Sequence, residues 1–149
     1  MILTDEKLKK LEEIATQLRC DVIEMLLEAK SGHSAGSLGM ADVFTALYFS
    51  GILNVDPKNP NWEDRDRVIL SNGHICPIHY AALARAGFFP VEELKTLRKF
   101  GSRLQGHPHA GILPGIDNSS GPLSQGFSIA VGLAYAAKMD RKKWQVYCL

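Results

Sequence analysis

Two short apolar runs, at residues 67–70 and 144–149, limit the fold of this chain more than any other feature. Runs of this length, next to polar or turn residues, are typical of buried strands in a parallel sheet. Helical patterns precede the first run and separate it from the second. Strands that alternate with helices predict an α/β fold, in which a parallel sheet is flanked by helices. Because two strands do not make a stable open sheet, we expect residues 1–149 to be the N-terminal part of a larger, apparently truncated domain.

Apolar periodicity predicts five helices, which are separated by loops. They are expected at residues 4–30, 40–49, 77–86, 91–100 and 121–139. Thr4 can cap the first helix, whose apolar residues recur every three or four positions. The run at 31–37 is expected to be non-helical, since its glycines and serines break helices. Residues 54–66 and 101–120 have the composition of loops, and the longer loop has a length that is usually functional or disordered.

The composition excludes several classes of protein. The formal net charge of +1 provides no basic field for nucleic acid. No apolar run approaches the roughly 20 residues of a membrane-spanning helix, and the acidic start at residues 1–6 is unlike a signal peptide. The three cysteines include no Cys-x-x-Cys pair, which indicates reduced thiols. We therefore expect a cytoplasmic protein that binds neither nucleic acid nor membranes.

Three Gly-His pairs lie in three separate predicted loops, at 32–33, 73–74 and 106–107. Glycine lets the backbone come close to a ligand, and histidine transfers protons near neutral pH. Loops commonly carry functional sites. His33, His74 and His107 are therefore candidate catalytic residues, although their spacing alone does not bring them together.

The turn Gly121-Pro122-Leu123 precedes the last predicted helix. The free N–H groups and the positive end of the dipole at a helix N-terminus can hold a phosphate. Proline is equally common at a simple junction between a loop and a helix. Both interpretations, a phosphate cradle and a structural junction, stay open at this point.

Other groupings are weaker. His107 and His109 could bind a metal, but no acidic residue follows at ligand spacing, so no metal ligand is predicted. Cys76 lies close to His74 in sequence, but cysteine is more commonly a small buried residue than a nucleophile. The charged run at 64–67 is most simply a solvated surface.

Taken together, these segments resemble the transketolase family. The matching segments are Ser31-Gly32-His33, Gly36-Ser37-Leu38-Gly39-Met40-Ala41-Asp42, Asp64-Arg65-Asp66-Arg67, Leu70-Ser71-Asn72-Gly73-His74, Gly106-His107-Pro108, Gly121-Pro122-Leu123 and Gln125-Gly126. They occur in the family's order, at about its spacings, and cover nearly the whole chain.

The resemblance implies a thiamine-diphosphate-binding fold that uses thiamine diphosphate and Mg²⁺. Such enzymes move a two-carbon ketol unit between sugar phosphates, as in the pentose phosphate pathway, and the cofactor does the carbon chemistry. By motif match, His74 and Gly121 would lie at the diphosphate. Pro122 belongs to the same turn, and Leu123 would pack near a cofactor ring. His33 and His107 would hydrogen-bond substrate hydroxyls and move protons.

The chain departs from the family pattern at three places and lacks later motifs. Ser34-Ala35 stands where Pro-Gly is common, Ser124 replaces a glycine, and His109 stands where an acidic residue often follows. The Gly-Asp-Gly metal motif would begin just after Leu149, and the glutamate that activates the cofactor belongs to a following domain. We therefore expect this chain alone to be inactive. It would work with a C-terminal transketolase domain or subunit, in a dimer or another homo- or hetero-oligomer.

Two alternatives stay open. One is a ketol-transferring relative such as 1-deoxyxylulose-5-phosphate synthase. The other, from a different class, is a non-catalytic assembly module that only binds a partner.

Overall fold

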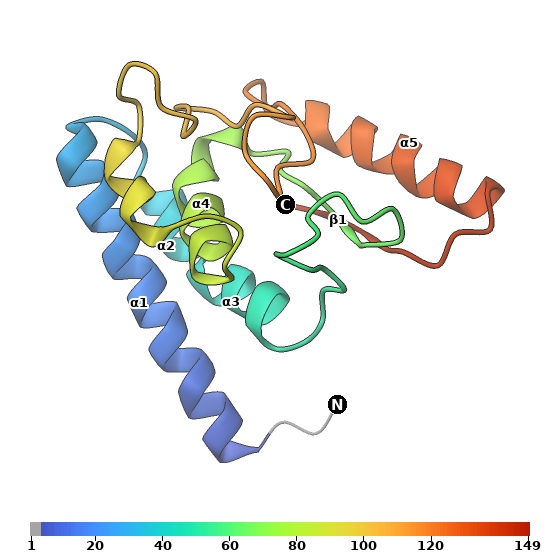
Figure 1. Ribbon diagram of the computed structural model, residues 1–149, viewed down its shortest axis with the longest axis horizontal. Coiled ribbons are helices and arrows are strands. Elements are labelled where there is room, and N and C mark those ends of the chain that lie inside the picture. The colour runs from blue at the N-terminus through green and yellow to red at the C-terminus, as the bar shows by residue number, and fades with distance from the viewer. Residues whose placement is uncertain (1–3) are drawn as a thin grey trace.

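The computed structural model describes residues 4–149, so residues 1–3, on which part of the expected acidic start falls, lie outside it. The elements in chain order are α1 (Asp5–Ala29), α2 (Ala35–Gly39), α3 (Ala41–Phe49), β1 (Arg67–Ile69), the 3₁₀ helix η1 (Gly73–Ile75), α4 (Cys76–Arg85), the 3₁₀ helix η2 (Val91–Thr96), α5 (Gln125–Met139) and β2 (Val146–Cys148). The described chain is mostly helical and has a small parallel sheet (Figure 1).

The long first helix forms as predicted. Thr4 is its cap, since the Thr4 hydroxyl accepts a hydrogen bond from the Lys7 N–H at 3.3 Å. The apolar stripe is buried at Leu18 and Val22, both 0% exposed. The helix ends where Lys30 takes a left-handed φ of 52°, which turns the chain into the first Gly-His loop.

The prediction that residues 31–37 contain no helix is wrong, because α2 begins at Ala35. The turn is held by the N–H of Leu38, which donates to Ser34 O at 2.9 Å. A side chain on Gly36 would bring its Cβ to 2.8 Å from Cγ2 of Ile75. Small residues thus let this turn pack closely on Ile75, and that packing overrides their low helix propensity.

The predicted α-helix at 91–100 is also wrong: its first part is the 3₁₀ helix η2 and the rest is irregular. Arg98 takes a left-handed φ of 60°, and its N–H donates to Leu104 O at 2.9 Å. The chain therefore folds back after η2. Leu94 and Leu97 are nevertheless buried, as the amphipathic pattern indicates.

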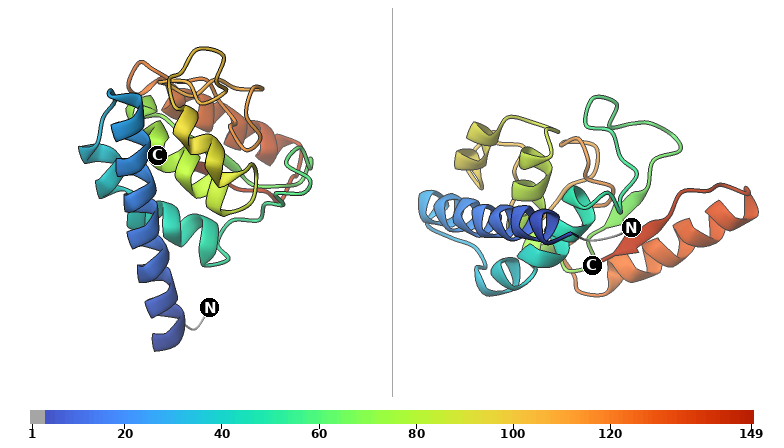
Figure 2. Two further views of the ribbon diagram at one scale, coloured as in Figure 1. Left: turned by 60° about the vertical axis from the view of Figure 1, so that its left-hand side comes forward. Right: turned by 90° about the horizontal axis from the view of Figure 1, so that it is seen from below.

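The two predicted strands form and pair in parallel, with Arg67 opposite Val146 and Ile69 opposite Cys148. Among the elements, α5 contacts only β1 and β2, whereas α1, α3, α4 and η2 pack on one another. Figure 2 shows the resulting shape, in which α5 projects away from the other helices. Among the elements the sheet likewise contacts only α5, so the helical layer meets this part of the chain through the segments between elements, such as Leu70 in the core.

The core lies between α1, α3 and α4. Its largest fully buried side chains include Tyr80, Phe44, Leu18, Met25, Ile78 and Leu83. The helix α4 is buried along most of its length, and η1 leads directly into it. Because η1 carries His74, the backbone of this histidine is fixed by the core.

In residues 4–149, none of the helices combines the length and the hydropathy needed to span a lipid bilayer.

Candidate functional site

The three histidines of the Gly-His pairs converge. The ring of His74 lies in the middle, with its centroid 4.9 Å from that of His33 and 4.9 Å from that of His107. Both neighbouring rings meet it at 84°, edge against face. Sequence spacing did not predict this proximity. The rings of His33, His74 and His107 thus form one cluster, although they come from three separate loops.

The loop of His74 is placed by its glycine. A Cβ on Gly73 would lie 2.7 Å from Ser120 Oγ and 3.0 Å from Gly121 N, which is too close for a side chain. Glycine at this position therefore allows the 120–121 turn to approach the start of η1. The predicted cradle turn and His74 are neighbours for this reason.

The loop of His33 is exposed and is held by α2. Ser37, which is fully buried, donates from its hydroxyl to His33 O at 3.2 Å. The packing of Gly36 on Ile75 joins this loop to η1. His33 thus reaches His74 from the solvent side.

The loop of His107 is half-buried and is held at both sides. The Cys76 thiol donates to Gly106 O at 3.3 Å, and Ser120 N–H donates to Pro108 O at 3.2 Å. These bonds place His107 between the start of α4 and the 120–121 turn.

Arg98 is a neighbour of the site that the sequence did not indicate. Its guanidinium donates to Ser31 Oγ at 3.5 Å and to Gly106 O at 3.4 Å, so it bridges the outer two histidine loops. No local pattern points to it, because only the unexpected fold-back after η2 brings it there. Desolvation lowers the pKa of His107, and the nearby His74 and Arg98 lower this pKa further. His107 is therefore neutral near pH 7 and can both donate and accept a proton.

A hollow of about 520 Å³ opens beside His33 and His74. Its lining is Gly32, His33, Ser34, Ala35, Gly36, Asn72, His74, Ile75 and Leu123. Two buried polar atoms at or near it, Asn72 Oδ1 and Ser120 Oγ, form no hydrogen bond within residues 4–149. Leu123 is 62% exposed and provides an apolar surface at the same place.

The Gly121-Pro122-Leu123 turn leads into α5, which begins at Gln125 rather than at 121 as predicted. Ser124 takes a left-handed φ of 72°, and its side chain makes no capping bond. Instead, the Ser71 hydroxyl accepts the Phe127 N–H at 3.1 Å, so the turn after β1 caps α5. The first turn of α5 thus faces the strand that leads to His74.

Three other side chains, those of Cys76, His109 and His79, are not members of the histidine cluster. Burial raises the pKa of the Cys76 thiol to about 12, so it is a protonated core residue rather than a nucleophile. His109 is exposed. His79, which the sequence did not single out, is buried and pairs with the Tyr48 hydroxyl at 2.8 Å. In the described part of the chain, no group of three or more His, Cys, Asp or Glu side chains could hold a metal ion.

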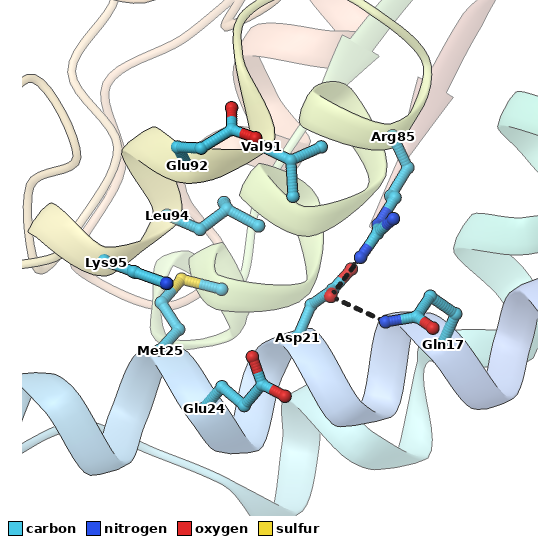
Figure 3. A pocket seen from close by; sticks show the side chains of 9 residues that line it. All are labelled: Gln17, Asp21, Glu24, Met25, Arg85, Val91, Glu92, Leu94 and Lys95. Atoms are coloured by element: carbon cyan, nitrogen blue, oxygen red, sulfur yellow. Dashed lines mark hydrogen bonds and ion pairs between the residues drawn. The ribbon is translucent and has the colours of Figure 1, made fainter.

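A second hollow, of about 320 Å³, lies between α1, α4 and η2 (Figure 3). At its floor Asp21 accepts hydrogen bonds from Arg85 Nε at 2.8 Å and from Arg85 Nη2 at 2.7 Å. Gln17 donates to the same carboxylate at 3.0 Å. The buried acid is thus fully paired, and this hollow shares no lining residue with the histidine site.

Comparison with known proteins indicates one family. Residues 10–146 match the family described as transketolase, thiamine diphosphate binding domain. A Clostridium protein, 6-deoxy-6-sulfo-D-fructose transketolase subunit SqwG, is 42% identical over 139 residues, which are 93% of this chain and 50% of that protein. Transketolase 1 of Escherichia coli is 41% identical over 85% of this chain and 19% of its own length.

Solved structures give the same result. Transketolase from Leishmania mexicana superposes with a TM-score of 0.86 at 36% identity, and that of Campylobacter jejuni with 0.85 at 37%. Each comparison covers 93% of this chain and less than a quarter of the other chain, at 22% and 23%. The chain spans about half the length of SqwG and about a fifth of the full-length transketolases. With the matched family domain, the identities and the superposed fold in agreement, this chain belongs to the transketolase family and corresponds to its N-terminal, thiamine diphosphate binding portion.

Proposed function

We propose that residues 1–149 form the diphosphate side of a transketolase active site, which transfers two-carbon ketol units between sugar phosphates. The observation that carries this proposal is the cluster of His33, His74 and His107 beside the turn at Gly121. The remaining parts of the site would come from further residues of the same protein or from a partner subunit. A cytoplasmic location belongs to this proposal, since the three cysteines are free.

The residues that are present fit thiamine diphosphate. The unpaired Asn72 Oδ1 and Ser120 Oγ are polar atoms with capacity for a ligand. The first turn of α5 offers backbone N–H groups and the positive end of a helix dipole to a diphosphate. The exposed face of Leu123 offers an apolar contact to a ring. Mg²⁺ would neutralise the diphosphate, and its ligands would come from outside this chain.

The mechanism assigns separate tasks to the three histidines. When bound, the cofactor supplies the nucleophilic carbon. His74, at the centre, would hold the diphosphate together with the backbone at Gly121 and the turn at Pro122. His107 and His33, on either side of it, would orient the hydroxyls of the sugar and exchange protons with them. A neutral His107 suits this task, because it accepts a proton from a hydroxyl at neutral pH.

An apolar band along α5 supports the proposal that the chain works with a partner. It consists of Leu123, Phe127, Val131, Tyr135 and Met139, which are 52–67% exposed. No charged residue lies between positions 121 and 137. Exposed apolar surface of this extent is typical of a protein interface. Because Leu123 also lines the hollow, a domain or subunit seated on this band would complete the wall of the site.

The substrate remains within the class of ketose and aldose derivatives. The name of the Clostridium relative adds a second candidate donor, 6-deoxy-6-sulfo-D-fructose, to the ketose phosphates. A sulfonate and a phosphate are both anions, so one site could accept either of them.

The test measures cofactor binding and ketol transfer by the chain alone and together with the rest of its protein or its partner subunit. Donors are xylulose 5-phosphate and 6-deoxy-6-sulfo-D-fructose, with ribose 5-phosphate as acceptor and thiamine diphosphate and Mg²⁺ present. We expect activity only in the completed assembly, and its loss in His74→Ala. Products from pyruvate and glyceraldehyde phosphate would instead identify a 1-deoxyxylulose-5-phosphate synthase. If the assembly neither binds the cofactor nor catalyses any of these transfer reactions, the proposed function is wrong and the chain is a non-catalytic assembly module.

A further inference from the structure

The outer edge of β1 is closed by two side chains rather than by a strand. β2 pairs with the other edge. On the outer edge, the Val68 N–H donates to Asp117 Oδ2 at 2.8 Å, and the Leu70 N–H donates to Asn118 Oδ1 at 2.9 Å. Alternate residues of a strand present their backbone groups to opposite edges, so Val68 and Leu70 face away from β2. Two consecutive side chains thus satisfy two consecutive outward amides.

Asn118 makes the more complete contact of the two. Its Nδ2 also donates to Leu70 O at 3.1 Å and to Ser119 O at 3.3 Å. The amide therefore bonds both the N–H and the carbonyl of Leu70, as a neighbouring strand would. The side chain is 5% exposed, so these bonds are shielded from water. Without them, both backbone groups of Leu70 would be left unpaired in the interior.

Asn118 lies in the same loop as His107, and a backbone bond links the two ends of that loop. Ser120 N–H donates to Pro108 O at 3.2 Å. The segment that carries His107 is therefore tied to residues 118–120, which the Asn118 amide fixes to the strand.

The hydrogen bonds of Asn118 also fix the position of the Gly121-Pro122-Leu123 turn. Gly121 follows the fixed residues directly, and its nitrogen lies 3.0 Å from the point that a Cβ on Gly73 would occupy. A continuous set of contacts thus connects the end of β1 with both walls around His74.

We infer that Asn118 is a positioning residue: its side-chain amide takes the place of a strand on the outer edge of β1 and thereby holds His107 and Gly121 beside His74. Asn118 does not line the hollow beside His33 and His74. The consequence for cofactor binding rests on the proposed function, whereas the consequence for the histidine geometry does not.

The test replaces Asn118 by leucine, which has a similar size and makes no hydrogen bond. The protein, with any subunit that accompanies it, is labelled in its histidine rings and titrated by NMR. In the wild type, burial and the nearby His74, Arg98 and His33 lower the pKa of His107. In Asn118→Leu we expect this pKa to rise toward 6.5 and the nuclear Overhauser effects between the His74 and His107 rings to disappear.

The matched control is Tyr48→Phe. It removes one buried hydrogen bond, between the Tyr48 hydroxyl and His79 Nε2, and none of the hydrogen bonds that hold Asn118. Both variants should lose stability, but only Asn118→Leu should alter the signals of His107. Equal changes in the two variants, or unchanged His107 signals in a folded Asn118→Leu protein, would overturn the inference.

Two further measurements keep the test decisive. If Asn118→Leu does not fold, amide hydrogen exchange is measured in the wild type instead. The Leu70 amide should then be protected as strongly as the Arg67 amide, which pairs with Gln145. Fast exchange of the Leu70 amide would contradict the inference. Calorimetry should show thiamine diphosphate affinity roughly tenfold weaker in Asn118→Leu, by analogy with outer-shell changes at metal sites, and little changed in Tyr48→Phe. A wild type that binds no thiamine diphosphate would refute the proposed function, and the His107 signals would still decide the role of Asn118.

Discussion

Ser124 has a strained backbone conformation just before α5. Its φ is 72°, which lies in the left-handed region. A left-handed conformation costs a residue with a Cβ roughly 1 kcal/mol, whereas glycine adopts it freely. The serine is thus accommodated, but with strain next to Leu123 and the start of α5.

We predict that Ser124→Gly does not destabilise the protein and raises the free energy of unfolding by up to about 0.5 kcal/mol. The free energy gained when the strain at this position is relieved exceeds the free-energy cost of the extra conformational entropy that glycine gives the unfolded chain. Ser128→Gly, inside α5, should instead cost about 0.5–1 kcal/mol. Urea unfolding of both variants measures the difference, and a loss of stability in Ser124→Gly would count against the strain.

His79 gives the stability of the fold a pH dependence. Burial lowers its pKa from 6.5 to about 4, because the charged ring has no water around it. Between these values the unfolded chain binds a proton that the native protein does not. The free energy of unfolding therefore falls as the pH drops from about 6.5 to 4, by about 3 kcal/mol in all.

Unfolding in urea at a series of pH values measures this dependence. His79→Gln should flatten the curve in that range, since glutamine can still pair with Tyr48 and does not titrate. His109→Gln should leave it unchanged, because His109 is exposed. An equally steep curve in His79→Gln would assign the effect to other groups.

Among the elements, α5 depends on one close approach to the sheet. A Cβ on Gly126 would lie 2.5 Å from Ser71 Cα, whereas one on Gly132 would meet no atom within 4 Å. The same helix therefore contains one glycine required by packing and one that is not. Gly126, Ala130 and Ala134 recur at every fourth position along α5. Of these, Gly126 and Ala130 are buried and Ala134 is exposed.

Alanine at these two glycines should have opposite effects. Gly126→Ala is expected to lower the free energy of unfolding by about 1–3 kcal/mol, because the backbone of the β1–η1 turn must move. Gly132→Ala should raise it by about 0.5–1 kcal/mol through helix propensity alone. Thermal unfolding measures both, and a stable Gly126→Ala protein would show that α5 can shift at little cost.

The elements that the sequence predicted are those with a local pattern. Periodicity and capping identified α1, α3, α4 and both strands, since neighbours along the chain determine them. The misses at α2 and η2 arose from tertiary contacts: packing on Ile75 in one case and the fold-back at Arg98 in the other. The edge made by Asp117 and Asn118 joins positions about 50 residues apart, so no local pattern could indicate it. The histidine cluster was expected only from the family resemblance, because spacing does not encode distance in space.

At the scale of the whole molecule, the apolar band on α5 predicts association. Val131 is 52% exposed in this band, and Val43 is 40% exposed on α3, outside it. Val131→Glu should weaken binding to a second copy or a partner subunit about 30-fold or more, because a buried unpaired charge costs at least about 2 kcal/mol. Val43→Glu should have little effect. Sedimentation velocity over a concentration series distinguishes the two, and equal behaviour of both variants would place the interface elsewhere.

The closed outer edge of β1 also governs how copies of this chain can aggregate. The outward backbone groups of Val68 and Leu70 are already bonded to Asp117 and Asn118, so a strand of another molecule cannot pair along this edge. Growth of a sheet from molecule to molecule needs an open edge on both sides of each copy. With the outer edge of β1 closed by Asp117 and Asn118, this sheet cannot grow in both directions.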